Sequence, residues 1–207
     1  DQNGNYNSSY VSITGPSSDF NSSMVDQDGD NNTNNMYQVG DYNNSEATQN
    51  GNYNNSYSDQ SGNGNGATAS QSGDYNNSYA YQYGNGNASS VGQAGNSNYS
   101  YVYQSGNDNG SAVDQSGTSN NSNTRQYGNE NMSDVLQDGT ANYSTVYQNG
   151  TGHDAEVDQY GTSNNSYIDQ YGNGHDADTY QNGGSNVSDV NQYGDTHGAY
   201  TSQTGSS

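Results

Sequence analysis

Polar and apolar positions alternate along the chain in a unit of eleven residues, Gln-x-Gly-x-x-Asn-x-(Ser/Ala)-x-(Val/Ala/Thr)-x, after which glutamine returns. The asparagine, the small residue, the aliphatic residue and the glutamine stand at every second position. One face of a β-strand of about seven residues therefore carries all four. The glycine two positions after the glutamine provides the backbone freedom that a tight reversal needs. Each unit thus predicts one strand and one arc.

The unit keeps its phase over nearly the whole chain. Glutamine opens it at Gln27, Gln38, Gln49, Gln60, Gln71, Gln82, Gln93, Gln104, Gln115, Gln126, Gln137, Gln148, Gln159, Gln170, Gln181, Gln192 and Gln203. Glycine follows at Gly29, Gly40, Gly51, Gly62, Gly73, Gly84, Gly95, Gly106, Gly117, Gly128, Gly139, Gly150, Gly161, Gly172, Gly183, Gly194 and Gly205. Asparagine fills its slot at Asn32, Asn43, Asn54, Asn65, Asn76, Asn87, Asn98, Asn109, Asn120, Asn131, Asn142, Asn164 and Asn186. Such regularity is typical of a solenoid.

The first residues follow the same unit with one interruption. Gln2 occupies its slot, whereas Ile13 stands in a glutamine slot, and three extra residues near Pro16 shift the register. We therefore expect an N-terminal coil with a register insertion over residues 1–26, followed by regular repeats over residues 27–207.

A second period lies on top of the first, because alternate units differ at their outward positions. One set is rich in tyrosine, and the other is rich in aspartate and glutamate. Two strands and two arcs then form one coil, which predicts an all-β, two-sheet parallel β-solenoid of about nine 22-residue coils. Amide columns in an in-register stack satisfy one another, so the polar interior is expected to leave no group unsatisfied. A thin aliphatic strip is expected between the amide columns.

Composition narrows the functional classes. Only 25% of the residues are hydrophobic and the formal net charge is −21, which by itself favours disorder, but the strict repeat outweighs this. Arg125 is the one cationic side chain of the lysine and arginine class, so the chain cannot neutralise a nucleic-acid backbone or an anionic membrane surface. No apolar run approaches the roughly 20 residues of a membrane span, so we expect no membrane insertion.

These spaced positions, taken together, resemble those of curlin, the major subunit of curli fibres, from Gln2 to Gly205. The resemblance implies a secreted subunit that folds as a two-sheet β-solenoid and polymerises into the extracellular amyloid of a bacterial biofilm matrix. It also implies two partners besides the chain itself, a surface nucleator subunit and an outer-membrane secretion channel. Two departures are that glycine stands in both arcs of each coil and that no glycine-rich secretion leader precedes the first unit.

Three histidines form a candidate site. His153, His175 and His197 take the asparagine slot in consecutive units of the acidic set. The column either binds a metal or senses pH, or it continues the polar ladder with imidazole rings. We favour the ladder, because a strand spacing of about 4.8 Å suits ring stacking better than shared tetrahedral coordination.

Acidic residues form a second candidate site. Asp134, Glu156 and Asp178 share one outward column, which either holds Ca²⁺ or is a solvated face; we favour the solvated face. No Ser/His/Asp, Cys/His or paired-carboxylate arrangement stands apart from the repeat. We therefore expect neither enzymatic activity nor a bound cofactor.

The sequence predicts a structural subunit that assembles by templated strand addition. The last unit keeps its motif to Gln203 and Gly205 without a following cap, and the first unit begins at Gln2, so both edges are expected to stack end to end into a cross-β fibre. The alternative is a soluble, monomeric β-solenoid that acts as an adhesin or ice-binding protein. Ice binders usually present threonine ladders, whereas the outward positions here carry tyrosine and aspartate.

Overall fold

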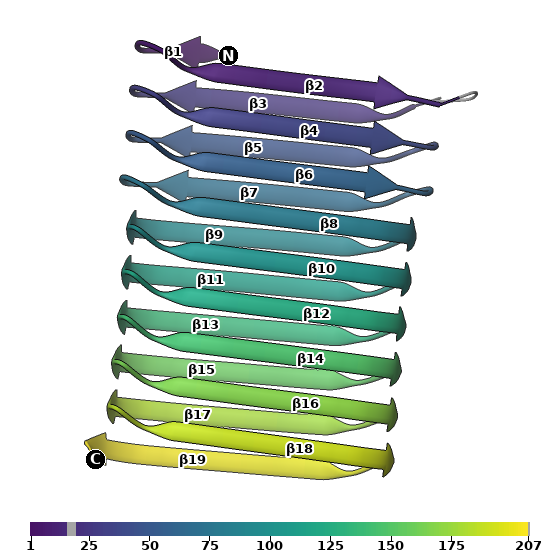
Figure 1. Ribbon diagram of the computed structural model, residues 1–207, viewed down its shortest axis with the longest axis vertical. Helices are drawn as coiled ribbons and strands as arrows, with labels where there is room; N and C mark the ends of the chain where they lie inside the picture. Colours follow the sequence, from purple (N-terminus) through teal and green to yellow (C-terminus); the bar gives the residue numbers. More distant parts are fainter. Residues whose placement is uncertain (16–19, 207) are drawn as a thin grey trace.

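Two parallel β-sheets lie against each other along the length of the molecule (Figure 1). The computed structural model describes residues 1–15 and 20–206; the insertion expected near Pro16 falls outside these residues. The chain passes alternately through the two sheets, so each coil contributes one strand to each sheet. This arrangement confirms the predicted two-sheet parallel β-solenoid of about nine coils.

The two sheets contain ten and nine strands. The ten-stranded sheet consists of β1 (Gln2–Asn3), β3 (Ser22–Asp28), β5 (Asn44–Asn50), β7 (Gly66–Ser72), β9 (Ala88–Asn96), β11 (Gly110–Thr118), β13 (Met132–Thr140), β15 (Asp154–Thr162), β17 (Asp176–Gly184) and β19 (Gly198–Ser206). The nine-stranded sheet consists of β2 (Ser8–Thr14), β4 (Thr33–Val39), β6 (Asn55–Ser61), β8 (Asn77–Asn85), β10 (Tyr99–Asn107), β12 (Asn121–Asn129), β14 (Tyr143–Thr151), β16 (Asn165–Asn173) and β18 (Val187–Asp195). Strands that neighbour each other in a sheet are therefore one coil apart in sequence.

The strands pair in register. Gln104 on β10 lies beside Gln82 on β8 and Gln126 on β12, an offset of 22 residues in both directions. The first pairs are offset by 25 residues, as Gln2 with Gln27 shows, which places three additional residues before the regular stack. Register is fixed by the alternation of inward and outward residues, because a slip of one residue would turn the amides outward.

The strands are longer than the repeat predicts. Strands β2 to β7 span seven residues each, but β8 to β19 span nine. The predicted strand length of about seven residues is therefore too short for most coils. Gly106 and Asn107 still pair with Gly128 and Asn129, because identical bends stacked above one another keep their backbones aligned.

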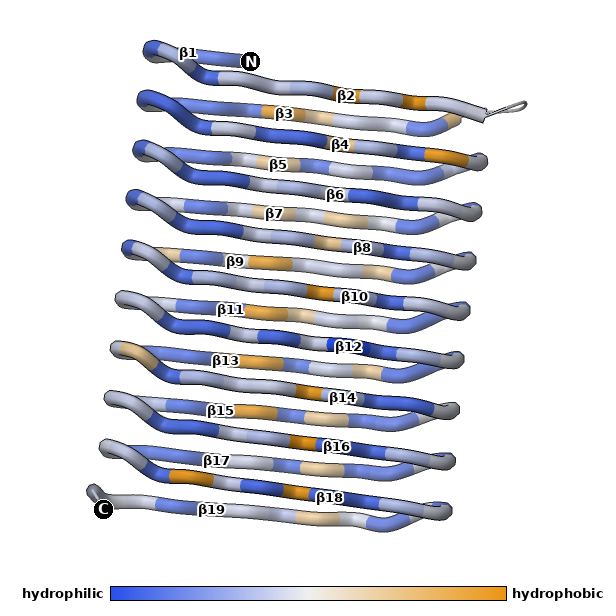
Figure 2. Tube along the Cα trace, viewed as in Figure 1, coloured by the Kyte–Doolittle hydropathy of each residue, from blue (hydrophilic) through white to orange (hydrophobic). Residues whose placement is uncertain are grey.

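A narrow aliphatic strip runs along the middle of the interior (Figure 2). Its buried members are Val91, Val102, Val113, Val135, Val146, Ala155, Val157, Ile168, Ala177 and Val190. Buried polar side chains lie on both sides of this strip. Among the described residues, none forms a helix with the length and hydropathy that crossing a bilayer would require.

Candidate functional site: amide ladders and outer faces

Two columns of glutamine side chains run through the interior, one in each sheet. From Gln27 to Gln203 in the ten-stranded sheet, Nε2 of each glutamine donates to Oε1 of the glutamine 22 residues later, at 2.8–2.9 Å. From Gln38 to Gln192 in the nine-stranded sheet, the same bond measures 2.8–3.0 Å. Every amide points in the same direction, so each column is a polar chain of hydrogen bonds.

The same glutamines tie the two sheets together. Nε2 of Gln104 also donates to the carbonyl oxygen of Ala88 on the facing strand β9 at 2.9 Å. Gln126 bonds in the same way to Gly110 at 2.8 Å. Both amide hydrogens are used, one along the stack and one across it, which satisfies the donor capacity of a buried primary amide.

The asparagine column connects each arc to the next coil. Oδ1 of Asn87 accepts a hydrogen bond from the backbone N–H of Asn109 at 3.2 Å, and its Nδ2 donates to the carbonyl oxygen of Gly106 at 2.9 Å. Similar pairs recur along the column. Asparagine thus fixes the polar backbone groups of the arcs, which strand pairing alone would leave without partners.

The arc glycines are required by stacking as well as by turning. Gly106 has φ +131°, and a Cβ placed on it would lie 1.8 Å from the carbonyl oxygen of Gly128. The same collision, with the carbonyl oxygen of the next coil's glycine, recurs at every arc glycine from Gly29 to Gly183. The repeat in the sequence indicates the backbone freedom at this position but not the close approach between coils.

Each arc contains a second left-handed residue, immediately before the asparagine slot. Glu130, Ala141 and Thr196 have φ between 54° and 56° there. Sequence reasoning missed this position because its residue type varies. Glycine at Gly64, Gly86, Gly152 and Gly174 in the same slot was the signal that could have revealed it.

The serine column contradicts the expectation of a fully satisfied interior. Eight buried hydroxyls in the small inward slot have no hydrogen-bond partner among the described residues; they belong to Ser45, Ser89, Ser100, Ser111, Ser122, Ser133, Ser144 and Ser166. An amide presents an oxygen to one neighbour and a nitrogen to the other, so it bridges the strand spacing of about 4.8 Å. A hydroxyl has a single oxygen on a short side chain and cannot bridge it.

Two irregular residues weaken the N-terminal coils. Ile13 pairs with Gln38, and Oε1 of Gln38 is buried without a hydrogen-bond partner among the described residues, because isoleucine cannot supply the donor. Asn34 stands in the small inward slot, and both polar atoms of its buried amide are unpartnered within the same residues. Buried polar atoms without partners cost stability, so these coils are less well satisfied than the later ones.

The three histidines form a stacked column in the asparagine slot. Ring centroids lie 5.0 Å apart between His153 and His175 and 5.3 Å apart between His175 and His197, with planes 9° apart. The backbone N–H of His175 donates to Nδ1 of His153 at 3.2 Å, and that of His197 donates to Nδ1 of His175 at 3.1 Å. Nδ1 therefore carries no proton and replaces the asparagine oxygen. Burial lowers the pKa of His153, which keeps the ring neutral.

The acidic column lies on the outside of the ten-stranded sheet. Asp134, Glu156 and Asp178 are neighbours in register, as the sequence predicts. Partial burial, followed by the charges of neighbouring carboxylates, raises the pKa of Asp134 and Glu156. Among the described residues, no group of three or more histidine, cysteine or carboxylate side chains is arranged to hold a metal ion.

Tyrosine side chains cover the outside of the nine-stranded sheet. Tyr81 and Tyr101 have ring centroids 5.5 Å apart, and Tyr83 and Tyr103 have centroids 5.7 Å apart, with the rings tilted. Offset and tilted ring pairs at this spacing are favourable. The guanidinium of Arg125 lies 5.6 Å from the ring centroid of Tyr101. This face is therefore aromatic.

The repeat that shapes both sheets is a known one. A comparison with protein families matches the curlin associated repeat to residues 62–95, 90–117, 128–161 and 154–183, together more than half of the chain. The chain belongs to the curlin family. A comparison with curated proteins finds no matching relative.

The residues that match the curlin repeat are the residues that form the strands of the solenoid. The first matched segment contains β7, β8 and all but one residue of β9, together with Gln71, Gln82 and Gln93. Curlin repeats and a β-solenoid fold fit a curli-like structural subunit of an extracellular type. The resemblance inferred from the spaced positions is thereby confirmed.

Proposed function

We propose that this curlin chain is the structural subunit of a curli-like amyloid fibre, assembled outside the cell for biofilm matrix and surface adhesion. The observation that carries the proposal is the uniform direction of the glutamine ladder. Gln2 donates from Nε2 to Gln27, so its Oε1 faces away from the stack as an acceptor. Gln203 accepts from Gln181, so its Nε2 is the donor at the opposite edge. The two edges are complementary.

The backbone at the edges supports the same contact. β19 and β1 are the outermost strands of the ten-stranded sheet, and both are parallel to their neighbours. A Cβ on Gly183 would lie 1.9 Å from the carbonyl oxygen of Gly205, but one on Gly205 would meet nothing within 4 Å. Each arc glycine from Gly29 to Gly183 has the carbonyl oxygen of the following coil in this position. Strand addition there continues the sheet without a new kind of contact.

The nine-stranded sheet supplies the weaker half of the junction. There β2 of an incoming copy follows β18, which places Ile13 opposite Gln192. Nε2 of Gln192 already donates to the carbonyl oxygens of Asp176 and His197, at 2.9 and 2.8 Å. Gln104 makes the two equivalent carbonyl contacts and still donates along the stack to Gln126, so opposite isoleucine the hydrogen of Gln192 that points along the stack finds no acceptor.

The remaining parts of the proposal follow from the family. A surface nucleator subunit starts the fibre, an outer-membrane channel secretes the chain, and the principal partner is another copy of the chain. Templated strand addition requires no catalytic residue and no cofactor, so we propose a non-enzymatic role. The net charge of −21 opposes binding to nucleic acid and to anionic membranes.

Incubation of purified protein tests this proposal. We expect fresh monomer on size-exclusion chromatography to convert to fibres visible by electron microscopy, and faster with added salt, because salt screens the repulsion between carboxylates. A protein that stays monomeric at all salt concentrations would contradict the proposal and support the alternative of a soluble β-solenoid adhesin or ice-binding protein.

A further inference from the structure

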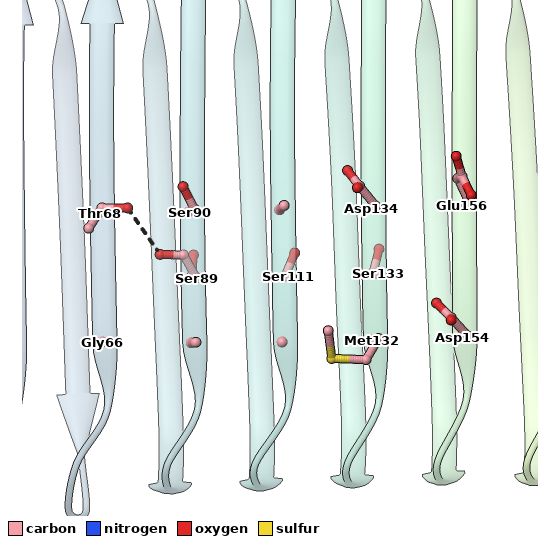
Figure 3. Close-up of a pocket in the computed structure, with 13 residues that line it drawn as sticks. Gly66, Thr68, Ser89, Ser90, Ser111, Met132, Ser133, Asp134, Asp154 and Glu156 are labelled. Carbon is pink, nitrogen blue, oxygen red and sulfur yellow. Dashed lines mark hydrogen bonds between the residues drawn. The ribbon is translucent and has the colours of Figure 1, made fainter.

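A hollow of about 640 Å³ lies on the outer face of the ten-stranded sheet (Figure 3). Its floor consists of small residues in two columns across β7, β9 and β11, namely Gly66, Ala88 and Gly110, and Thr68, Ser90 and Ala112. Larger side chains border one end, where β13 contributes Met132 and Asp134 and β15 contributes Asp154 and Glu156. The floor lies between Glu46 of β5, which is paired with Thr68, and the larger side chains of β13.

A column of large outward side chains, called the ridge below, lies on the outer face of the nine-stranded sheet, opposite this hollow. Tyr81, Tyr103 and Arg125 form one outward column on β8, β10 and β12. Each precedes a glutamine whose amide donates across the interior to the carbonyl oxygen of Gly66, Ala88 or Gly110, respectively. The ridge and the hollow therefore occupy nearly the same level along the solenoid and nearly the same position along the strands, on opposite faces.

The ridge and the border of the hollow also carry opposite charges. Arg125 is the chain's one arginine or lysine, its side chain is exposed, and it forms no ion pair with any carboxylate among the described residues. Arg125 lies across the interior from Gly110, on the opposite face of the solenoid. On β13, Met132 is paired with Gly110, and Asp134 follows two positions later. The single cation thus lies at the level of the acidic border of the hollow.

We propose that the hollow receives the Tyr81–Tyr103–Arg125 ridge of a second copy of the chain. The two copies lie side by side in the same orientation, related by a translation perpendicular to the sheets, and Arg125 of one meets Asp134 of the other. The contact joins two different faces, so it does not close and links fibres laterally into bundles. This inference rests on the proposed function, because it places fibres beside one another.

The same arrangement limits the contact to the central coils. Further along the solenoid, Asp169 and Asp189 face outward from the nine-stranded sheet, and Asp158 and Asp178 face outward from the ten-stranded sheet. Copies in the same orientation bring these carboxylates toward each other, and like charges repel. Bundling is therefore expected to strengthen as salt screens the acidic ends.

Cysteine pairing in mixed fibres tests the contact, because the chain contains no cysteine. Asn123→Cys lies beside the ridge on β12, and Leu136→Cys lies on β13 of the other sheet, at the same level of the solenoid. Both variants keep Arg125 and Asp134. The two variants are purified separately, mixed, assembled and oxidised. We expect a disulfide-linked dimer on a non-reducing gel. Asp189→Cys, three coils further along the same column as Asn123, is the matched control and is expected to give at most a few per cent of that dimer.

The outcomes separate the two proposals. Fibres that show no Asn123→Cys to Leu136→Cys dimer, or the same amount of dimer with Asp189→Cys, would overturn the lateral contact and leave the fibre proposal standing. A mixture that stays monomeric would contradict the fibre proposal and the lateral contact together. Bundles whose width falls to that of single fibres in Arg125→Gln, but not in the charge-matched Asn191→Asp, would support the contact from the native side chains.

Discussion

Nε2 of Gln104 donates to Oε1 of Gln126 at 2.9 Å, and the two glutamines are 22 residues and one coil apart. The glutamine ladder has one such hydrogen bond per coil. Both of these side chains are fully buried. The bond has a direction, and a stack of such bonds makes one edge of the molecule a donor and the other an acceptor. The fold and the proposed assembly therefore use the same contact.

Removal of one ladder member should weaken the stack. In Gln104→Ala, Nε2 of Gln82 loses its acceptor and Oε1 of Gln126 loses its donor. We expect the free energy of unfolding to fall by about 1–3 kcal/mol, measured by denaturant titration of the monomer. Tyr103→Ala, which removes the neighbouring outward side chain, should cost clearly less. Equal losses in the two variants would mean that the assignment of inward and outward faces is wrong.

The serine column predicts a stabilising substitution. The hydroxyl of Ser133 is buried without a partner, and alanine already fills this slot on the next strand at Ala155. Ser133→Ala removes a polar atom that is costly to bury, so the free energy of unfolding should rise by about 1 kcal/mol. The outward Ser90→Ala is the control and should change stability by less than about 0.5 kcal/mol. A loss of stability in Ser133→Ala would show that the hydroxyl has a partner after all.

The second left-handed position of the arcs predicts another stabilising substitution. Ala141 has φ 55°, where a Cβ is unfavourable by about 1–2 kcal/mol. Glycine relieves this strain and loses some of the gain to its larger chain entropy, so Ala141→Gly should raise the melting temperature. Ala88→Gly, on an outward strand position, should lower it by the usual cost of glycine in a strand. Matching shifts in the two variants would refute the strain assigned to the arc.

The sequence predicts the parts of this molecule that repeat in residue type. The alternation of Asn, Ser/Ala, Val and Gln predicts the strands, and the second period at the outward positions predicts two sheets, the coil length and the acidic and tyrosine faces. Strand length was underestimated, because stacked glycines such as Gly106 and Gly128 keep their pairing only when the next coil bends identically. The unpartnered hydroxyl of Ser133 and the left-handed Ala141 depend on distances between coils, which spacing along the chain does not report.

The histidine column predicts a pH-dependent stability. Burial lowers the pKa of His153 from its ordinary value of 6.5, and Nδ1 of His153 accepts a backbone hydrogen bond that a proton would abolish. The stability that depends on the neutral ring is therefore present above about pH 6.5 and is lost as the pH falls through the lower pKa of the folded state. The carboxyl pKa of the adjacent Asp154 is raised by burial and by Asp176, so its protonation stabilises the fold, but at lower pH.

Replacement of the three histidines by asparagine separates these effects. The variant His153→Asn/His175→Asn/His197→Asn restores the residue that fills this slot in other coils. Between about pH 7.5 and pH 5.5, we expect its unfolding midpoint to change little while that of the unsubstituted protein falls. Parallel curves for the two proteins over this range would show that the imidazoles do not control the transition.

The mass per length of single fibres, measured by scanning transmission electron microscopy, tests end-to-end stacking most directly. About nine coils spaced by about 4.8 Å give each molecule of 21.9 kDa about 43 Å of fibre axis. End-to-end stacking predicts about 0.5 kDa per Å for an unbundled fibre, or a whole multiple of this value for a bundle. A fibre in which each chain occupies a single layer of about 4.8 Å would have about nine times that mass per length, and such a value in the thinnest fibres would contradict end-to-end stacking of the solenoids.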